Sequence, residues 1–278
     1  MSENKRKILI LGGKGYVGSN VMDQATKKNI TFFGTSRSLD NDTNILQTDI
    51  YNHSSLLSVI TKSNPDVIVW TLMSGENECE LINSGLVNLL SIIKKETKLL
   101  FISTDAVFTE GIGDYKETDK IGTLPNDAPL SVYVNAKYKG EYLIKENHSN
   151  HIIIRTGPIY GSSSNTCIEK RTTRIIEQIK ENKNIQAATN LYRTFIHVND
   201  LSNAIIELIE KDFSGTIHLG PMQKISYYTF YKRRLEQLGI NTPITSYEIT
   251  KEESIVSLDT SLNTQKANEL LKTNFRTI

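Results

Sequence analysis

Short apolar runs alternate with longer amphipathic segments along this chain. Residues 8–11, 66–72 and 99–105 are runs of this kind, rich in Ile, Leu, Val and Phe. Such a run between turn residues is typical of a parallel strand that is buried on both faces of a sheet. The segments between the runs are long enough to form helices that cover the sheet. The pattern therefore predicts an α/β protein with a doubly wound parallel sheet.

The same pattern predicts the individual elements. We expect further strands at residues 31–35, 45–50, 193–198 and 215–220, and helices at residues 19–28, 54–63, 81–95, 168–180, 200–210 and 226–239. Ser54 should cap its helix, because a serine hydroxyl accepts a hydrogen bond from a free N–H of the first turn. Leu86, Leu89, Leu90 and Ile93 share one helix face, which predicts a core contact or a subunit interface.

A glycine-rich turn joins the first predicted strand to the first predicted helix. Gly12 permits the tight turn, Gly15 lets the backbone approach a pyrophosphate, and Gly18 lets the helix pack closely on the strand. The helix then presents free N–H groups to the phosphates. Strand, turn and helix together predict a Rossmann-type dinucleotide site, with a purely structural turn as the alternative. The side chains between these glycines are counted as cofactor contacts: Lys14, Tyr16 and Val17.

The end of the second predicted strand bears on the choice of cofactor. NAD-binding sites usually carry an acidic residue there, which binds the ribose 2′-hydroxyl. Here the place holds Ser36 and Arg37. An arginine can instead hold a 2′-phosphate, so we predict NADP(H) in preference to NAD(H). The alternative is an exposed loop arginine. Asp49, near the end of the third predicted strand, is placed to meet the adenine, with Ile50 beside it.

Tyr133 and Lys137 lie four residues apart and would share one face of a helix. We expect the Lys137 ammonium to lie near the Tyr133 phenol and to lower its pKa from the usual value of about 10. A phenol adjusted in this way exchanges a proton with a substrate oxygen near neutral pH. The spacing alone is weak evidence, and the alternative is a surface helix with a half-buried tyrosine.

Thr104 stands at the end of the strand predicted at residues 99–105. The carboxyl ends of strands are where open parallel sheets bind ligands. A threonine that merely closes a strand is common, but this one precedes the Tyr133–Lys137 pair by about 30 residues. We therefore predict a catalytic set of Thr104, Tyr133 and Lys137. Asp105 follows directly and is counted with the substrate contacts.

Composition excludes several function classes. The chain has 278 residues, a formal net charge of +1 and a pI near 7.7, so no strong field attracts nucleic acid or an anionic membrane. No apolar run reaches the roughly 20 residues that cross a bilayer. Residues 1–7 show no signal-peptide pattern, so we expect a cytoplasmic protein. Cys79 and Cys167 lack metal-ligand spacing, which predicts no metal site. We interpret His197 and His218 as sheet or core residues.

Beyond these patterns, the chain resembles the extended short-chain dehydrogenase/reductase family over nearly its whole length. Within that family it is most similar to the branch of the dTDP-4-dehydrorhamnose reductases, the RmlD-like sugar-nucleotide reductases. The resemblance rests on the glycine turn and on the motifs at residues 103–108, 133–141, 154–161, 194–201 and 257–261. The Ser-Thr-Asp-x-Val-Phe run at residues 103–108 is fairly specific to this branch.

The resemblance implies a fold and an activity. It implies a Rossmann-type sheet with a small C-terminal substrate-binding lobe. The activity would be NADPH-dependent reduction of the 4-keto group of a nucleotide-diphosphate 4-keto-6-deoxy sugar, in deoxysugar or polysaccharide biosynthesis. Tyr133 would protonate the sugar oxygen, Thr104 would hydrogen-bond to it, and Lys137 would hold the nicotinamide ribose. The partner would be the nucleotide-sugar substrate, and a homodimer is left open.

The resemblance also implies interleaved domains. Residues 1–156 and about 191–219 would form the NADP-binding domain, and about 157–190 and 220–278 the substrate lobe. Arg193 looks like the diphosphate-binding arginine of the wider family and is counted with the substrate contacts. Two arginines of the helix at residues 168–180 could also face a diphosphate, but we interpret them as solvent-facing: Arg171 and Arg174.

Some positions depart from the family pattern. The strand that contains Trp70 lacks the usual Asn-Ala-Ala ending, and residues 74–83 lack the usual Val-Asp-x-Ala-Glu run. Two alternatives therefore stay open: a nucleotide-sugar epimerase or dehydratase, and a catalytically idle NADP-binding regulatory subunit. Asp105 stands where dual-function epimerase-reductases carry a cysteine, which favours reduction. The complete set of Thr104, Tyr133 and Lys137 argues against an idle subunit.

Overall fold

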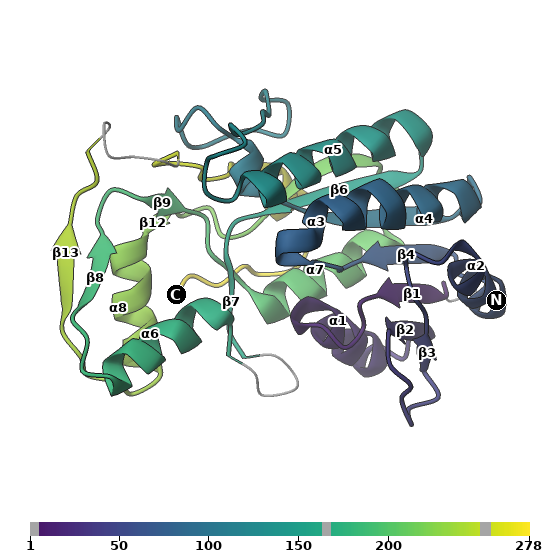
Figure 1. The fold of residues 1–278 in the computed structure, drawn as a ribbon, viewed down its shortest axis with the longest axis horizontal. Helices are drawn as coiled ribbons and strands as arrows, with labels where there is room; N and C mark the ends of the chain where they lie inside the picture. The colour runs from purple at the N-terminus through teal and green to yellow at the C-terminus, as the bar shows by residue number, and fades with distance from the viewer. Residues whose placement is uncertain (1–5, 163–167, 251–256) are drawn as a thin grey trace.

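A parallel sheet of seven strands forms the centre of the protein in the computed structural model, which describes residues 6–162, 168–250 and 257–278. The strands are β1 (Ile8–Leu11), β2 (Phe32–Ser36), β3 (Ile45–Gln47), β4 (Val67–Trp70), β5 (Lys98–Thr104), β6 (His151–Thr156) and β11 (Gly215–Leu219). They lie in the order β11-β6-β5-β4-β1-β2-β3 (Figure 1). The predicted fold class is confirmed.

Helices cover both faces of this sheet. One face packs against α1 (Tyr16–Lys27), α7 (Val198–Glu210) and α9 (Gln265–Leu270), and the other against α2 (His53–Ser63), α4 (Val87–Ile92) and α5 (Ser131–Asn147). Strand β1 shows why its sequence is continuously apolar. Ile8 and Ile10 join the first core cluster, Leu9 and Leu11 join the second, and all four are fully buried. Alternate residues of a strand point to opposite faces, so a covered strand needs apolar side chains throughout.

A second, smaller lobe lies beside the sheet (Figure 1). It contains α6 (Lys170–Lys180), α8 (Tyr227–Gln237) and the parallel pair of β8 (Ile185–Ala188) and β13 (Ile244–Tyr247). Its core is the cluster of Ile175, Ile185 and Leu235. Short strand pairs lie between the lobe and the sheet: β7 (Ile159–Tyr160) with β10 (Ile196–His197), and β9 (Tyr192–Arg193) with β12 (Ile225–Ser226).

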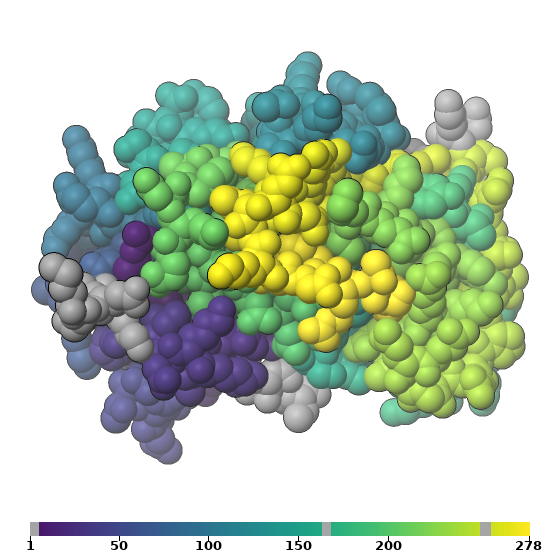
Figure 2. All heavy atoms as spheres, turned by 180° about the vertical axis from the view of Figure 1, so that it is seen from behind, coloured from purple at the N-terminus to yellow at the C-terminus, as the bar shows by residue number. Residues whose placement is uncertain are grey.

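The C-terminal segment returns to the main sheet. Figure 2 shows it in yellow, crossing the back of the molecule. Leu271 and Phe275 belong to the core cluster beneath α7, and Arg276 forms an ion pair with Asp200 at 2.7 Å. These residues were expected in the substrate lobe, but their contacts are with the sheet domain. The apolar side chains of this segment complete the face that α1 and α7 leave uncovered.

Several predicted boundaries are wrong in detail. Asn52 caps α2, because its side-chain oxygen accepts from Ser55 N–H at 2.9 Å, and the predicted cap Ser54 lies inside the first turn. The strand predicted at residues 193–198 is split into β9 and β10, which pair with different partners. Between them, the Thr194 hydroxyl accepts from Leu262 N–H, so this stretch ties down the C-terminal segment instead of extending a sheet.

The helix expected at residues 81–95 also differs. It is preceded by a 3-10 turn, η1 (Gly75–Asn77), and runs through α3 (Glu78–Glu80) and a π-helical stretch, η2 (Leu81–Leu86), into α4. A further 3-10 turn, η3 (Asp105–Val107), follows β5. Within the described ranges, no helix combines the length and the apolar character that spanning a bilayer requires.

Candidate active site

The carboxyl ends of the central strands converge where the order of the sheet changes direction. Strand β1 pairs with β2 on one side and with β4 on the other, which makes the crevice beyond β1 and β4 the expected ligand position. Two contacts connect this edge with later parts of the chain. The Tyr16 hydroxyl donates to the Gly161 carbonyl at 2.6 Å, and Arg193 pairs with Asp105.

The glycine turn after β1 has the close contacts that the sequence predicts. Gly12 has a φ of +88°, a left-handed conformation that favours glycine. A Cβ atom on Gly18 would lie 2.1 Å from the Gly12 carbonyl oxygen, so no side chain fits there. Gly15 N–H donates to that same oxygen at 2.9 Å, and α1 starts directly afterwards without a capping side chain. The turn fits a backbone cradle for a pyrophosphate.

The side chains of this turn make different contacts. Lys14 is exposed and forms an ion pair with Asp40, in the segment after β2. Tyr16 is half-buried, and its hydroxyl is engaged by Gly161. Val17 packs against the core. The ion pair therefore holds the charge of Lys14 at the segment after β2, where a cofactor ribose is expected.

The residues after β2 and β3 differ in whether their side chains are free to meet a ligand. Arg37 is exposed, and its side chain has no hydrogen bond or ion pair within the described part of the chain. The Ser36 hydroxyl lies 3.3 Å from that of Ser38. Asp49 is exposed, but its carboxylate accepts from Tyr51 N–H at 3.0 Å and so closes a turn. Ile50 is 7% exposed and belongs to the core, which leaves its backbone as the part that could meet a ligand.

Thr104 and Tyr133 are brought together by β5 and α5. The Thr104 hydroxyl lies close enough to the Tyr133 phenol to influence its pKa. The Thr104 hydroxyl also donates to Asp105 Oδ1 at 3.2 Å and accepts from Ala106 N–H. Burial raises the pKa of the Tyr133 phenol above its usual range, and the neighbouring Thr104 hydroxyl opposes this only in part. Tyr133 is therefore a neutral proton donor at neutral pH.

The expected effect of Lys137 on Tyr133 is wrong. Lys137 is 3% exposed, and its Nζ lies 3.0 Å from Glu78 Oε1 and 5.8 Å from the centre of the Tyr133 ring. Glu78 is fully buried, so its negative charge offsets the ammonium and raises the pKa of Tyr133. No sequence pattern pointed to this carboxylate, because it lies in a separate helix after β4.

The predicted substrate contacts Asp105 and Arg193 are engaged by the protein itself. Arg193 Nη1 donates to the carbonyls of Tyr192 and Leu258, and Nη2 donates to that of Ser257 at 3.0 Å. Its Nε lies 3.7 Å from Asp105. With every guanidinium nitrogen occupied, Arg193 closes the C-terminal segment over β5. It is not available to a diphosphate in this arrangement, contrary to our expectation.

Asp105 is similarly occupied. Its Oδ2 accepts from the Thr260 hydroxyl at 2.8 Å, and its Oδ1 accepts from Thr104. Burial raises the pKa of this carboxyl, and the Arg193 charge opposes the shift. Asp105 therefore orients Thr104 from behind and links it to the C-terminal segment, instead of facing an open space.

Arg171 was expected to face solvent, and the structure places it differently. It is half-buried near the start of α6, and its guanidinium lies 5.6 Å from the centre of the Tyr227 ring. Its charge opposes the burial that raises the pKa values of Tyr133, Asp105 and Tyr16, so Arg171 lies in the neighbourhood of the predicted catalytic set. Within the described residues it has no hydrogen bond or ion pair. The helical period could have placed it on the inner face of α6, but not opposite Tyr133.

The two histidines lie in strands, as interpreted from the sequence. His218 is fully buried in β11, and His197 packs edge-on against Tyr160. Among the described residues, no group of His, Cys, Asp and Glu is arranged to hold a metal ion. Cys79 is a free, exposed thiol, and Cys167 lies outside the described residues, as do residues 1–5 of the polar N-terminus.

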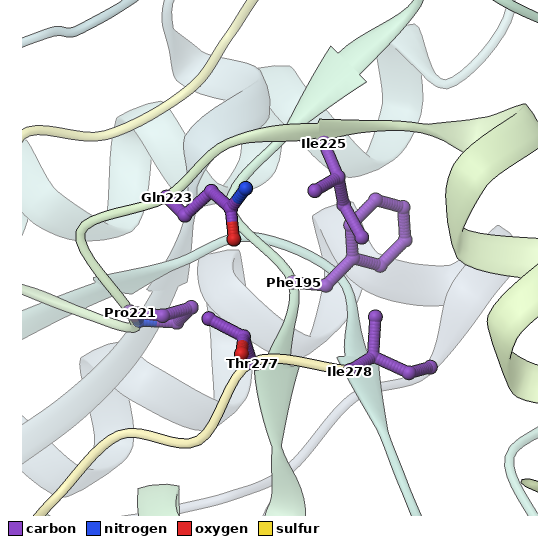
Figure 3. A pocket seen from close by; sticks show the side chains of 6 residues that line it. All are labelled: Phe195, Pro221, Gln223, Ile225, Thr277 and Ile278. Atoms are coloured by element: carbon purple, nitrogen blue, oxygen red, sulfur yellow. The ribbon is translucent and has the colours of Figure 1, made fainter.

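A small hollow near the C-terminus is separate from this site. Figure 3 shows its lining, in which Phe195 and Ile225 lie above the terminal residues Thr277 and Ile278. Its volume is about 10 Å³, which is room for roughly one water molecule. It contains none of the predicted catalytic residues and is too small for a nucleotide sugar.

Comparison with known proteins gives a family match. The family model described as RmlD substrate binding domain matches residues 6–276. The spore coat polysaccharide biosynthesis protein SpsK of Bacillus subtilis is 23% identical over 258 residues, which cover 89% of this chain and 84% of SpsK.

Two solved structures share the fold. A dTDP-4-dehydrorhamnose reductase from Bacillus anthracis, in complex with NADP, superposes with a TM-score of 0.78 at 21% identity, covering 98% of this chain and 95% of that one. The enzyme WbmH of Bordetella bronchiseptica, in complex with NAD+, gives a TM-score of 0.79 at 17% identity, covering 98% and 94%. At these identities the likeness concerns the fold, and the neighbours include both cofactors.

Proposed function

The chain belongs to the RmlD substrate binding domain family, and from this premise we propose that it reduces the 4-keto group of a nucleotide-diphosphate 4-keto-6-deoxy sugar, with NADPH as the reductant. Family membership supports the broader class, a sugar-nucleotide oxidoreductase or epimerase with a nicotinamide cofactor. The observation that carries the finer proposal is the approach of the Thr104 hydroxyl to the Tyr133 phenol, at the carboxyl end of β5 and one helical turn from Lys137.

The catalytic set supplies the proton for this reduction. The sugar carbonyl oxygen would accept a hydrogen bond from the phenol of Tyr133, and a second one from the Thr104 hydroxyl when its proton turns from Asp105 to the sugar. The bound nicotinamide supplies the hydride to the carbonyl carbon. As negative charge develops on the oxygen, the Tyr133 proton moves to it. Because burial keeps the phenol protonated at neutral pH, the site is ready for reduction without a prior proton uptake.

We assign cofactor binding to the turn after β1 and to the segment after β2. The backbone of Gly12 to Gly18 would hold the pyrophosphate, and Lys137 would hold the nicotinamide ribose. Arg37 and Lys14 are exposed cations near the expected adenine ribose, which supports a 2′-phosphate and hence NADPH. The Lys14–Asp40 ion pair would have to open for Lys14 to contribute.

Substrate binding requires a cation for the diphosphate. Arg193 is enclosed by backbone carbonyls, whereas Arg171 faces the crevice from α6 and keeps its donors free within the described residues. We therefore assign the diphosphate to Arg171 in this arrangement. Tyr227, beneath its guanidinium, would keep the side chain extended over the site.

The experiment that tests the function is a substrate panel. The purified protein is mixed with NADPH and with dTDP-, UDP- and GDP-linked 4-keto-6-deoxy sugars, and absorbance of the reduced nicotinamide is followed. Loss of absorbance with formation of the 4-hydroxy sugar supports the proposal. Conversion of a nucleotide sugar without net NADPH consumption would indicate an epimerase or dehydratase. Tight NADPH binding without turnover on any sugar would indicate an idle regulatory subunit.

A further inference from the structure

A buried carboxylate lies directly beneath the catalytic lysine. Glu78, the first residue of α3, is fully buried, and its Oε1 lies 3.0 Å from Lys137 Nζ. Its Oε2 accepts from Ser74 N–H at 2.6 Å, which fixes the carboxylate to the segment after β4. Within the described residues, Oε1 makes no hydrogen bond besides this ion contact. The carboxylate therefore has one charged partner, and that partner belongs to the catalytic set.

Stability alone does not account for such a pair. Desolvating two charges costs about as much as their attraction returns, so packed apolar residues of similar size would serve a fold equally well. An apolar side chain in place of Lys137 could pack here, because the Phe101 ring already borders this position. Its centre lies 4.9 Å from Lys137 Nζ. A charged pair kept beside Tyr133 is better explained by what it does to Lys137.

We propose that Glu78 is a positioning residue for the reduction: it fixes the Lys137 ammonium beside Tyr133 and keeps it charged inside the protein. This inference rests on the proposed function for its catalytic meaning, but the ion pair itself can be tested without substrate or cofactor. Glu78 acts through Lys137 and is not itself assigned to the substrate.

The charges around Lys137 agree with this role. Burial lowers the pKa of the ammonium, and Glu78 provides the largest opposing effect. Glu141, one turn further along α5, acts in the same direction, but its carboxylate is bound to Arg155. Glu78 is thus the carboxylate whose charge is directed at Lys137.

The same charge reaches Tyr133. The phenol is faced by Thr104, Glu78, Asp105 and Arg171. Glu78 and Asp105 raise its pKa, whereas Thr104 and Arg171 lower it, and Asp105 is itself partnered by Arg193. Removing the Glu78 charge should therefore lower the pKa values of both Lys137 and Tyr133. Both groups act in their protonated forms, so the two changes affect reduction in the same direction.

The direct test is the titration of Lys137 in the cofactor-free protein. The ε-carbons of ¹³C-labelled lysine are followed by NMR, and the Lys137 signal is assigned by its loss in Lys137→Arg. In Glu78→Gln the Lys137 pKa should fall by about one to three pH units, the usual effect of an opposite charge within about 4–6 Å. Glu80→Gln is the matched control, since Glu80 is exposed and contacts Ser84. An unchanged Lys137 titration in Glu78→Gln overturns the proposal.

Activity gives the second readout. The high-pH limb of turnover should move to lower pH in Glu78→Gln, and Glu78→Asp, which restores the charge, should recover part of the shift. A loss that is equal at all pH values, or a failure of both variants to fold, would show a structural role instead. If the wild-type protein reduces no nucleotide sugar, the proposed function fails, and the Lys137 titration still decides the role of the ion pair.

Discussion

Arg155 and Glu141 form a buried, two-pronged ion pair between β6 and α5. Arg155 Nε donates to Oε1 at 2.9 Å and Nη2 donates to Oε2 at 2.8 Å, while the Ser103 hydroxyl donates to Oε1 at 2.6 Å. Neither charged side chain is more than 1% exposed. The pair therefore fixes α5, which carries the predicted proton donor Tyr133, against β6, and the Ser103 hydroxyl connects the same carboxylate to β5, the strand that ends at Thr104.

Breaking this pair should destabilise the whole sheet domain. In Glu141→Gln the buried guanidinium of Arg155 loses its counter-charge, which typically costs about 3–5 kcal/mol. Urea denaturation of wild type and variant measures the difference. Lys145→Ala is the control, because Lys145 contacts the same carboxylate from the surface at 3.4 Å, and such a contact contributes about 0–1 kcal/mol. Similar losses in both variants would contradict our account of the buried pair.

Tyr133→Phe should abolish turnover while leaving the fold intact. The change removes one hydroxyl and keeps the half-buried ring, so NADPH affinity should stay near the wild-type value. Loss of a general acid lowers turnover by about 10²–10⁴-fold. The measurements are the steady-state rate on a confirmed substrate and NADPH binding by fluorescence. Near-normal turnover in this variant would mean that the proton comes from another group, with Asp105 the first candidate.

Arg37→Ala should weaken NADPH binding and leave NADH binding nearly unchanged. A hydrogen bond to a charged group contributes about 1.5–3 kcal/mol, which corresponds to roughly ten- to a hundredfold in affinity. Arg37→Lys is the matched variant and should retain part of the preference, because it keeps the charge but not the planar geometry. Equal losses for the two cofactors would show that Arg37 has a structural role.

Arg171 and Arg174 offer a comparison within one helix. Arg171 is half-buried against Tyr227, whereas Arg174 is exposed. Arg171→Ala should reduce the affinity for dTDP, UDP or GDP by roughly ten- to a hundredfold, as expected for a lost charged hydrogen bond. Arg174→Ala should change it little. Isothermal titration calorimetry measures both. If Arg193→Ala folds normally and is the variant that loses binding, the diphosphate belongs to Arg193 after all.

The buried His218 predicts a loss of stability in acid. Its Nδ1 contacts the carbonyls of Tyr115 and Asn263, and its Nε2 lies 3.4 Å from Arg155, so the neutral ring fits. Burial lowers its pKa from 6.5 to about 4. Because this pKa is below that of the unfolded chain, the unfolded state takes up the proton first. Stability should therefore decline as the pH falls from 6.5 towards 4, by about 3 kcal/mol for this group.

Denaturation curves across that pH range test the effect. His218→Gln lacks the titrating group, so its stability should depend less on pH. Part of the dependence should persist, because the pKa of His197 is also lowered to about 4 by burial. An identical pH dependence in wild type and His218→Gln would contradict the assignment.

Local patterns were enough to predict most strands of the central sheet, the glycine turn and the proximity of Tyr133 and Thr104. The apolar run of β1 can be read because burial on both faces leaves no room for alternation. The glycine turn can be read because Gly12 and Gly18 meet steric limits that no other residue satisfies. Thr104 and Tyr133 could be associated because a strand end and a helix of the same fold meet at a known edge of the sheet.

Long-range electrostatics could not be read in this way. The Glu78–Lys137 contact joins residues 59 positions apart, and the Glu78 charge adds to the burial that raises the pKa of Tyr133. Arg193 matched a family motif, yet the carbonyls of Ser257 and Leu258 occupy it. The sequence by itself determined the fold and predicted the candidate catalytic side chains, because these depend on periodicity and local sterics. Only the tertiary structure decided which charges are free, because burial and partners from distant segments set the state of each one.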